Sequence, residues 1–180
     1  MSLTLAKKTV SVKTQTLATL MAIVAAILVP QVFHVAGRLL GVGTALGEIF
    51  LPMHLPIILV GLLAGPYAGG IAGILSPLVS FMLTGMPSAV VLPLMMVEVG
   101  FYGLTAGIMR NVKTDDIVKV VVAQVSGRAM RLIVTAVLFA LTLTKVNPIG
   151  VFTAVRAGIV GLLLQWSILP IISTLVKSKK

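Results

Sequence analysis

Residues 43–88 read GTALGEIFLPMHLPIILVGLLAGPYAGGIAGILSPLVSFMLTGMPS and contain two apolar segments in close succession, 51–64 and 66–84. Gly65 and Pro66 join the two segments. Glycine commonly ends a helix and proline commonly begins one, so this pair predicts a hairpin of two helices. Glycines at four-residue spacing clear one helical face for close approach by another helix: Gly61, Gly65, Gly69 and Gly73.

The composition of the whole chain places this hairpin in a membrane. Of 180 residues, 58% are hydrophobic, and the mean hydropathy is +1.16. A soluble domain of this size could not bury so much apolar surface, and runs approaching the ~20 residues that cross a bilayer recur along the chain. We therefore predict a single all-α integral membrane domain over residues 1–180, built as a bundle of six spanning helices. The expected helices are 15–36, 51–64, 66–84, 88–109, 115–143 and 150–176.

The net charge of +10 is explained by membrane topology. With both termini in the cytoplasm, only Arg38 and Lys145 are basic residues of the outer side, which fits the excess of Lys and Arg in cytoplasmic loops. The basic residues of the cytoplasmic side are then Lys7, Lys8, Lys13, Arg110, Lys113, Lys119, Lys177, Lys179 and Lys180. No basic face interleaved with aromatic residues is present, so no nucleic-acid partner is expected.

The sequence lacks the motifs of an enzyme. It contains no cysteine, no HExxH motif, no paired catalytic acids and no Ser–His arrangement. His34 and His54 are two isolated histidines, which do not make a metal site. Without a Walker A motif the chain cannot itself hydrolyse ATP by that route. We therefore expect no catalytic activity, no metal and no cofactor in this chain.

Charged residues inside two expected spans indicate a functional interior. An unpaired charge in hydrocarbon costs at least ~2.5–3.5 kcal/mol and is tolerated mainly when it faces a bundle interior or a cavity. One polar stripe at helical spacing lies in 115–143 and consists of Gln124, Arg128, Arg131 and Thr135. A second stripe lies in 88–109 and consists of Glu98, Tyr102 and Thr105. Since these two helices run in opposite directions, Glu98 and Arg131 are expected at similar depth as an ion pair.

The two stripes supply most of the candidate substrate contacts. One acid against two arginines leaves excess positive charge, which an anionic group of a ligand could neutralise. In the alternative, Arg128 reaches the cytoplasmic interface while Arg131 and Glu98 only pair with each other. Two further candidates are His54, near the outer end of its span, and Asn147, in an outer connection. The full set of candidate substrate contacts is Glu98, Tyr102, Arg128, Arg131, His54 and Asn147.

Two further segments have a candidate role. Segment 37–50 is a Gly-rich outer connection with Arg38 and Glu48, suited to cover an outward-facing pocket, although an ordinary surface loop would look the same. The helix expected at 15–36 carries a small-residue face that could pack within the chain or against a partner: Ala18, Ala22 and Ala26.

Several of these features together resemble the substrate-binding S component of an energy-coupling factor (ECF) vitamin transporter. They are the PMHLP segment, the hairpin GLLAGPYAGGIAGILSPLVSFMLTGMPS, the Gly127-Arg128 pair and the alanine face of the first helix. The resemblance covers nearly the whole chain and implies that a vitamin binds at the outward side, beneath the connection between helices one and two. It also implies that the alanine face meets a transmembrane coupling subunit, which sits on two ATPases that bind and hydrolyse ATP. The expected setting is a multi-pass protein of a bacterial plasma membrane.

Within that family, the chain is most similar to the pantothenate-specific type, and an anionic substrate agrees with the arginine excess. Folate-specific members usually have an Arg-Phe-Gly-type segment before helix two, where this chain has EIFLPMH at 48–54. The single tryptophan, Trp166, also argues against an aromatic-stacked pocket for a flat pterin or flavin. A hydroxymethylpyrimidine or pyridoxine-type substrate stays open, because Glu98, Tyr102 and Asn147 could hydrogen-bond a neutral ring.

Two other classes of membrane protein are weighed against this interpretation. A stand-alone secondary transporter would need a site for a coupling ion and commonly an internal repeat, and no convincing repeat relates the two halves of the chain. A membrane scaffold without a transport role would gain nothing from the cost of buried charged stripes.

Overall fold

The computed structural model describes residues 10–178, which form eight α-helices and no strand. The helices are α1 (Val12–Leu39), α2 (Ala45–Phe50), α3 (His54–Ala64), α4 (Pro66–Thr84), α5 (Leu92–Met109), α6 (Asp116–Ala140), α7 (Gly150–Ala157) and α8 (Ile159–Ser178). Six helical segments are long and apolar enough to cross a membrane, with α2 and α3 together making one of them. The predicted all-α architecture with six spans is therefore confirmed.

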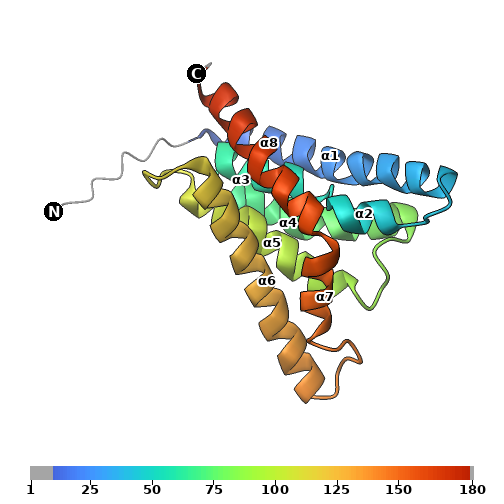
Figure 1. The fold of residues 1–180 in the computed structure, drawn as a ribbon. Coiled ribbons are helices and arrows are strands. Elements are labelled where there is room, and N and C mark those ends of the chain that lie inside the picture. Colours follow the sequence, from blue (N-terminus) through green and yellow to red (C-terminus); the bar gives the residue numbers. More distant parts are fainter. Residues whose placement is uncertain (1–9, 179–180) are drawn as a thin grey trace.

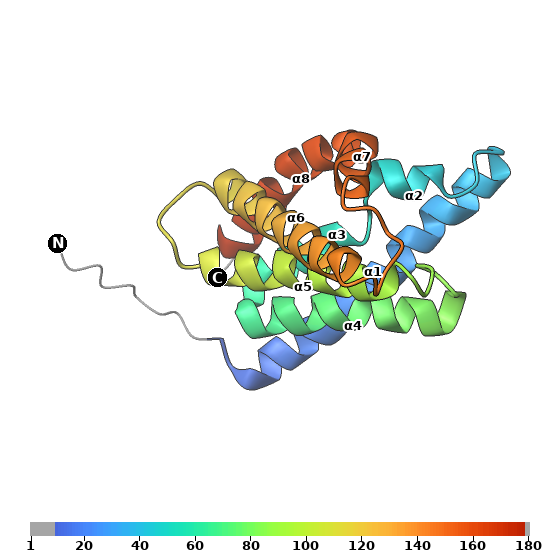
Figure 2. The same ribbon diagram turned by 90° about the horizontal axis from the view of Figure 1, so that it is seen from below.

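The helices lie on two sides of α5. Figure 2 shows α6 and α8 on one side of α5, and α4 and α1 on the other. The start of α1, the end of α8 and the α5–α6 connection lie at one end of the molecule, and α2 lies at the opposite end (Figure 1). An even number of spans requires both ends of the chain on one side; that this side is cytoplasmic stays a prediction. Four of the basic residues counted for that side lie outside the described residues: Lys7, Lys8, Lys179 and Lys180.

The glycine face of the α3–α4 hairpin receives α5. Gly65 turns the chain with a φ of 109°, a conformation that side chains rarely adopt. Gly61 and Gly69 both lie against the backbone carbonyl of Gly103, and a Cβ at either position would overlap that oxygen. Gly73 has the same relation to the carbonyl of Val99. The predicted close approach of another helix is confirmed, and the approaching helix is α5.

Segment 37–50 is mostly helical, in contrast to the predicted loop. The first helix continues to Leu39, and α2 begins at Ala45, so the connection itself is 40–44. Gly41 and Gly43 turn the chain there with φ values of 71° and 58°. The backbone N–H of Val42 closes the end of α1 by donating to the Gly37 carbonyl at 2.9 Å. The glycines that suggested a long flexible connection thus make one tight turn.

The predicted helix 150–176 is divided into α7 and α8 at Gly158. A Cβ at Gly158 would lie 2.6 Å from Cδ1 of Leu51, and one at Gly161 would lie 2.6 Å from the Phe50 carbonyl. The end of α2 therefore packs directly onto the α7–α8 break. Because the break depends on this contact between distant segments, the local sequence did not predict it.

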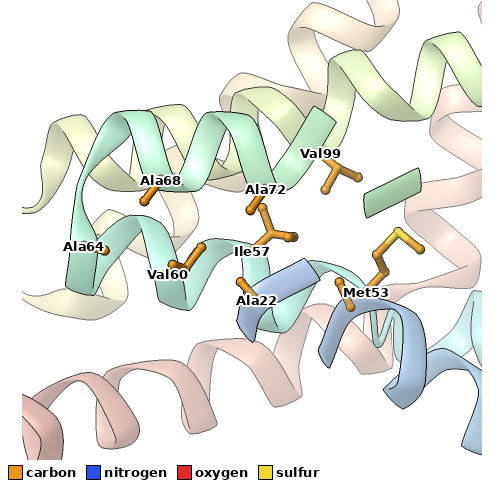
Figure 3. Close-up of a cluster of buried hydrophobic side chains, with 9 residues drawn as sticks. Ala22, Met53, Ile57, Val60, Ala64, Ala68, Ala72 and Val99 are labelled. Atoms are coloured by element: carbon orange, nitrogen blue, oxygen red, sulfur yellow. The ribbon is translucent and has the colours of Figure 1, made fainter. Parts of the chain in front are cut away.

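The alanine face of α1 packs inside the chain, which is one of the two arrangements that the sequence left open. Ala22 is 6% exposed and Ala26 is fully buried, and both belong to a cluster with apolar residues of α3 and α4 (Figure 3). Ala18 is partly buried against the same cluster. Small side chains on all three helices let their backbones approach closely. In this structure the chain's own helices cover Ala22 and Ala26, and a role of this face in binding the coupling subunit stays a prediction.

Candidate functional site

A cavity of about 500 Å³ lies at the end of the molecule that carries α2. Its wall is built from both sides of the bundle: α1, α2, the start of α3, α4, the connection at 86–88, α5, the middle of α6, and α7. The volume is in the range of small-molecule sites, which combine an apolar lining with a few placed polar groups. The histidine and charged side chains that line this cavity come in two groups, one from α3, α5 and α6 and one from α1 and α2.

The first group, the inner polar cluster, consists of His54, Glu98, Arg128 and Arg131. Nη1 of Arg131 lies 2.5 Å from Oε2 of Glu98, and Nη1 of Arg128 lies 3.8 Å from Oε1 of the same carboxylate. Glu98 is 2% exposed. The predicted ion pair is therefore present, and the two polar stripes face each other at Glu98, Arg128 and Arg131. The alternative in which Arg128 reaches the cytoplasmic interface is wrong, because Arg128 lines the cavity.

Tyr102 supports this cluster from behind. Its hydroxyl donates to Oε1 of Glu98 at 2.6 Å, and its ring is fully buried outside the cavity wall. The His54 ring meets it edge-on, with ring centroids 4.9 Å apart. Gly127 of α6 lies against the other side of the tyrosine, where any side chain would overlap the ring. Tyr102 therefore contacts Glu98 and His54 and does not itself line the cavity.

The inner polar cluster holds more hydrogen-bond donors than its single acid can satisfy. Arg128 Nε, Arg128 Nη2 and Arg131 Nε are buried and have no partner among the described residues, and neither does Nδ1 of His54. Guanidinium groups keep their charge in proteins, so two positive charges face one negative charge. Buried polar groups normally have partners, and each one without a partner costs ~1–3 kcal/mol or more. The arrangement suits an anionic group beside Arg128.

The second group, the outer polar pair, consists of His34 on α1 and Glu48 on α2. Oε1 of Glu48 accepts a hydrogen bond from the Thr44 hydroxyl at 3.3 Å. Nδ1 of His34 is buried without a partner in the described part of the chain. The His34 ring lies against Gly47, where a Cβ would be 2.8 Å from Cε1. His34 was not identified as a site residue from the sequence. The one sequence feature that could have indicated it is its position just before the predicted cover, 37–50.

A hydrogen-bond chain beyond the cavity fixes the α2–α3 break. Gln124 donates to Oε1 of Gln165 at 2.9 Å and accepts from the Trp166 indole at 2.6 Å. Gln165 donates in turn to the carbonyl of Leu51, at 3.2 Å. Gln124 thus hydrogen-bonds the side chains of Gln165 and Trp166 on α8 and does not line the cavity. Within residues 10–178, no three His, Asp or Glu side chains converge to hold a metal ion.

Comparison with known families decides what kind of protein carries this cavity. The model of the family described as "ECF transporter, substrate-specific component" matches residues 13–176. The chain belongs to this family. It is therefore a multi-pass protein of the plasma membrane and a transport binding protein, not an enzyme. S components bind the substrate and associate with an ECF energy-coupling module, whose ATPase subunits hydrolyse ATP. No curated protein and no solved structure matches the chain.

The S component brings most of its sequence-predicted site residues to the cavity. The wall includes His54, Glu98, Arg128 and Arg131, together with Glu48 of the predicted cover. Asn147 is exposed and away from the wall, where its Oδ1 accepts the Ile149 N–H at 2.9 Å. Asn-Pro sequences favour such turns, so the role expected for Asn147 as a substrate contact is corrected to that of a turn residue. Arg38 is exposed on the last turn of α1 and also outside the wall.

Proposed function

We propose that this S component binds pantothenate, with the vitamin's carboxylate beside Arg128. The observation that carries the proposal is the donor excess of the inner polar cluster. Nε and Nη2 of Arg128, which have no partner within residues 10–178, form one edge of the guanidinium group. A carboxylate accepts two parallel hydrogen bonds from such an edge. The ligand would then add a negative charge without displacing Glu98 from Arg131.

The rest of the cavity is compatible with the body of this vitamin. Apolar side chains also line the wall, among them Pro30, Met53, Val91 and Met95. They suit the branched aliphatic part of pantothenate, because apolar contact area supplies binding free energy without demanding further hydrogen bonds. We also propose that α2 and the turn at 40–44 act as the cover of this site, as segment 37–50 was expected to do.

The decisive experiment is calorimetric titration of the purified protein with pantothenate and with its neutral alcohol analogue. The two ligands differ only in the carboxylate. Under this proposal pantothenate binds at least about tenfold more tightly, since a hydrogen bond to a charged group contributes ~1.5–3 kcal/mol. Equal affinity for the two ligands would refute the contact between carboxylate and arginine.

A neutral-ring vitamin is the second candidate. His54 favours it, because Nδ1 is buried in the cavity wall without a partner and could hydrogen-bond a hydroxypyridine or aminopyrimidine ring. If neither pantothenate nor its alcohol binds and pyridoxine or hydroxymethylpyrimidine does, this candidate replaces the first. Reconstitution with an energy-coupling module would then test ATP-driven uptake of whichever vitamin binds.

A further inference from the structure

The contacts of the outer polar pair within the fold do not explain why a histidine and a glutamate stand at these two positions. Glu48 is exposed, and within residues 10–178 no basic side chain lies within ion-pair distance of its carboxylate. Its hydrogen bond from Thr44 is local to α2 and leaves most of the carboxylate's acceptor capacity free. His34 is more costly, because its Nδ1 is buried without a partner among the described residues, in a wall that an apolar residue could fill.

The fold nevertheless brings these two side chains to the same cavity. His34 comes from α1, and Glu48 comes from α2 after the turn at 40–44. Gly47 allows the contact, since a Cβ there would lie 2.8 Å from Cε1 of His34. The absence of a side chain at this position lets α2 lie directly on the histidine ring. The packing of α2 against α1 therefore brings the two residues of the outer polar pair to the same cavity.

We propose that His34 and Glu48 form a second subsite, which binds hydrogen-bond donors at the end of the ligand opposite its carboxylate. This inference rests on the proposed function and deepens it. The cavity wall then carries three kinds of lining: the arginines, apolar side chains and the outer polar pair. The cavity takes a monoanion whose far end carries hydroxyl groups. Pantothenate has this pattern, with a carboxylate at one end and two hydroxyls at the other.

The subsite also determines what the cavity rejects. A carboxylate accepts hydrogen bonds from hydroxyls but offers no donor, so Glu48 gains nothing from a ligand end that only accepts. A dicarboxylate would place its second negative charge beside Glu48, and such like-charge contacts are an effective means of discrimination. The arginines therefore select for an acid, and Glu48 selects against a second one.

The test is a cycle of two ligands and three proteins. The ligands are pantothenate and its dideoxy analogue, in which hydrogen replaces both hydroxyls. The proteins are the wild type, Glu48→Gln and the matched control Arg38→Gln, whose charged residue is exposed nearby but outside the cavity wall. In the wild type we expect calorimetry to give about tenfold tighter binding of pantothenate than of the dideoxy analogue.

Glu48→Gln should remove most of that preference and leave the affinity for the dideoxy analogue within about twofold of the wild type, because only the hydroxyls contact Glu48. Arg38→Gln should retain the preference. His34→Phe provides a second variant, which keeps a ring against Gly47 and removes both ring nitrogens; it should also reduce the preference.

Three outcomes would overturn the subsite. The first is equal affinity of the wild type for the two ligands. The second is a Glu48→Gln variant that keeps the preference for pantothenate, and the third is an equal loss of affinity for both ligands in Glu48→Gln. Each of these outcomes leaves the pantothenate assignment standing. Failure of the wild type to bind either ligand would overturn the subsite and the proposed function together.

Discussion

Replacing Arg128 should weaken ligand binding without lowering the stability of the fold. Replacing Arg131 should mainly lower the stability of the fold. The two arginines are tied unequally to Glu98: Arg131 approaches it to 2.5 Å and Arg128 only to 3.8 Å. Arg128 also keeps a whole guanidinium edge without a partner among the described residues. The sequence indicated both arginines as candidate ligand contacts, and their unequal contacts with Glu98 favour Arg128 for this role.

The magnitudes follow from what each change leaves behind. Arg128→Gln removes one charged donor from the ligand, which costs ~1.5–3 kcal/mol, or about tenfold to more than a hundredfold in Kd. Glu98 keeps its bonds to Arg131 and Tyr102, so the stability of the fold should not fall. Arg131→Gln instead leaves a buried carboxylate without its close partner, and breaking a buried pair in this way costs ~3–5 kcal/mol.

Two assays on the same preparations separate these effects. Calorimetric titration with pantothenate measures Kd, and thermal unfolding in detergent without ligand measures stability. Arg156→Gln is the matched control, because that arginine is exposed on α7 and outside the cavity wall. The reasoning is refuted if Arg128→Gln binds pantothenate like the wild type, or if Arg131→Gln is as stable as the wild type.

Further predictions test the packing and the cover. Gly103→Ala would drive a methyl group into the Gly69 carbonyl and should lower stability by at least ~1–3 kcal/mol in thermal unfolding; Gly150→Ala, with open space around it, is the control. Ala22→Trp should reduce vitamin binding and ATP-driven uptake together, because its face packs inside the chain; loss of uptake with unchanged binding would contradict this packing. Saturating pantothenate should slow amide hydrogen exchange in residues 40–50, and unchanged exchange would reject their role as a cover.

The features predicted correctly from the sequence are those that a membrane imposes locally. A span must be long and apolar whatever it packs against, so the six spans could be predicted without any knowledge of their neighbours. The Glu98–Arg131 pair was predictable for a related reason. A charge inside a span needs a partner, and helical spacing with opposite helix directions left few possible pairs. The glycine face of the hairpin likewise predicts the close approach of another helix without any knowledge of which helix it is.

The features that were missed depend on contacts between distant segments. Glycine at 158 is compatible with a continuous membrane helix, and only the Leu51 side chain against it explains the α7–α8 break. Alanines on α1 predict close packing but do not say whether the partner is α3 and α4 or another protein. His34 acquires its place in the wall through Gly47, which lies in another helix. No pattern along the chain encodes these pairings.

Glu98 connects the stability of the fold to the charge of the ligand. Two arginines facing a cavity without an acid would leave two buried charges uncompensated, which the folded protein could hardly sustain. A second acid would satisfy both arginines and remove any need for a ligand. With one acid, held by Tyr102 and paired closely to Arg131, the protein folds with a deficit of a single negative charge beside Arg128. Under the proposal that Arg128 binds the ligand, the counter-ion that stabilises the interior thus also determines that a monoanion completes it.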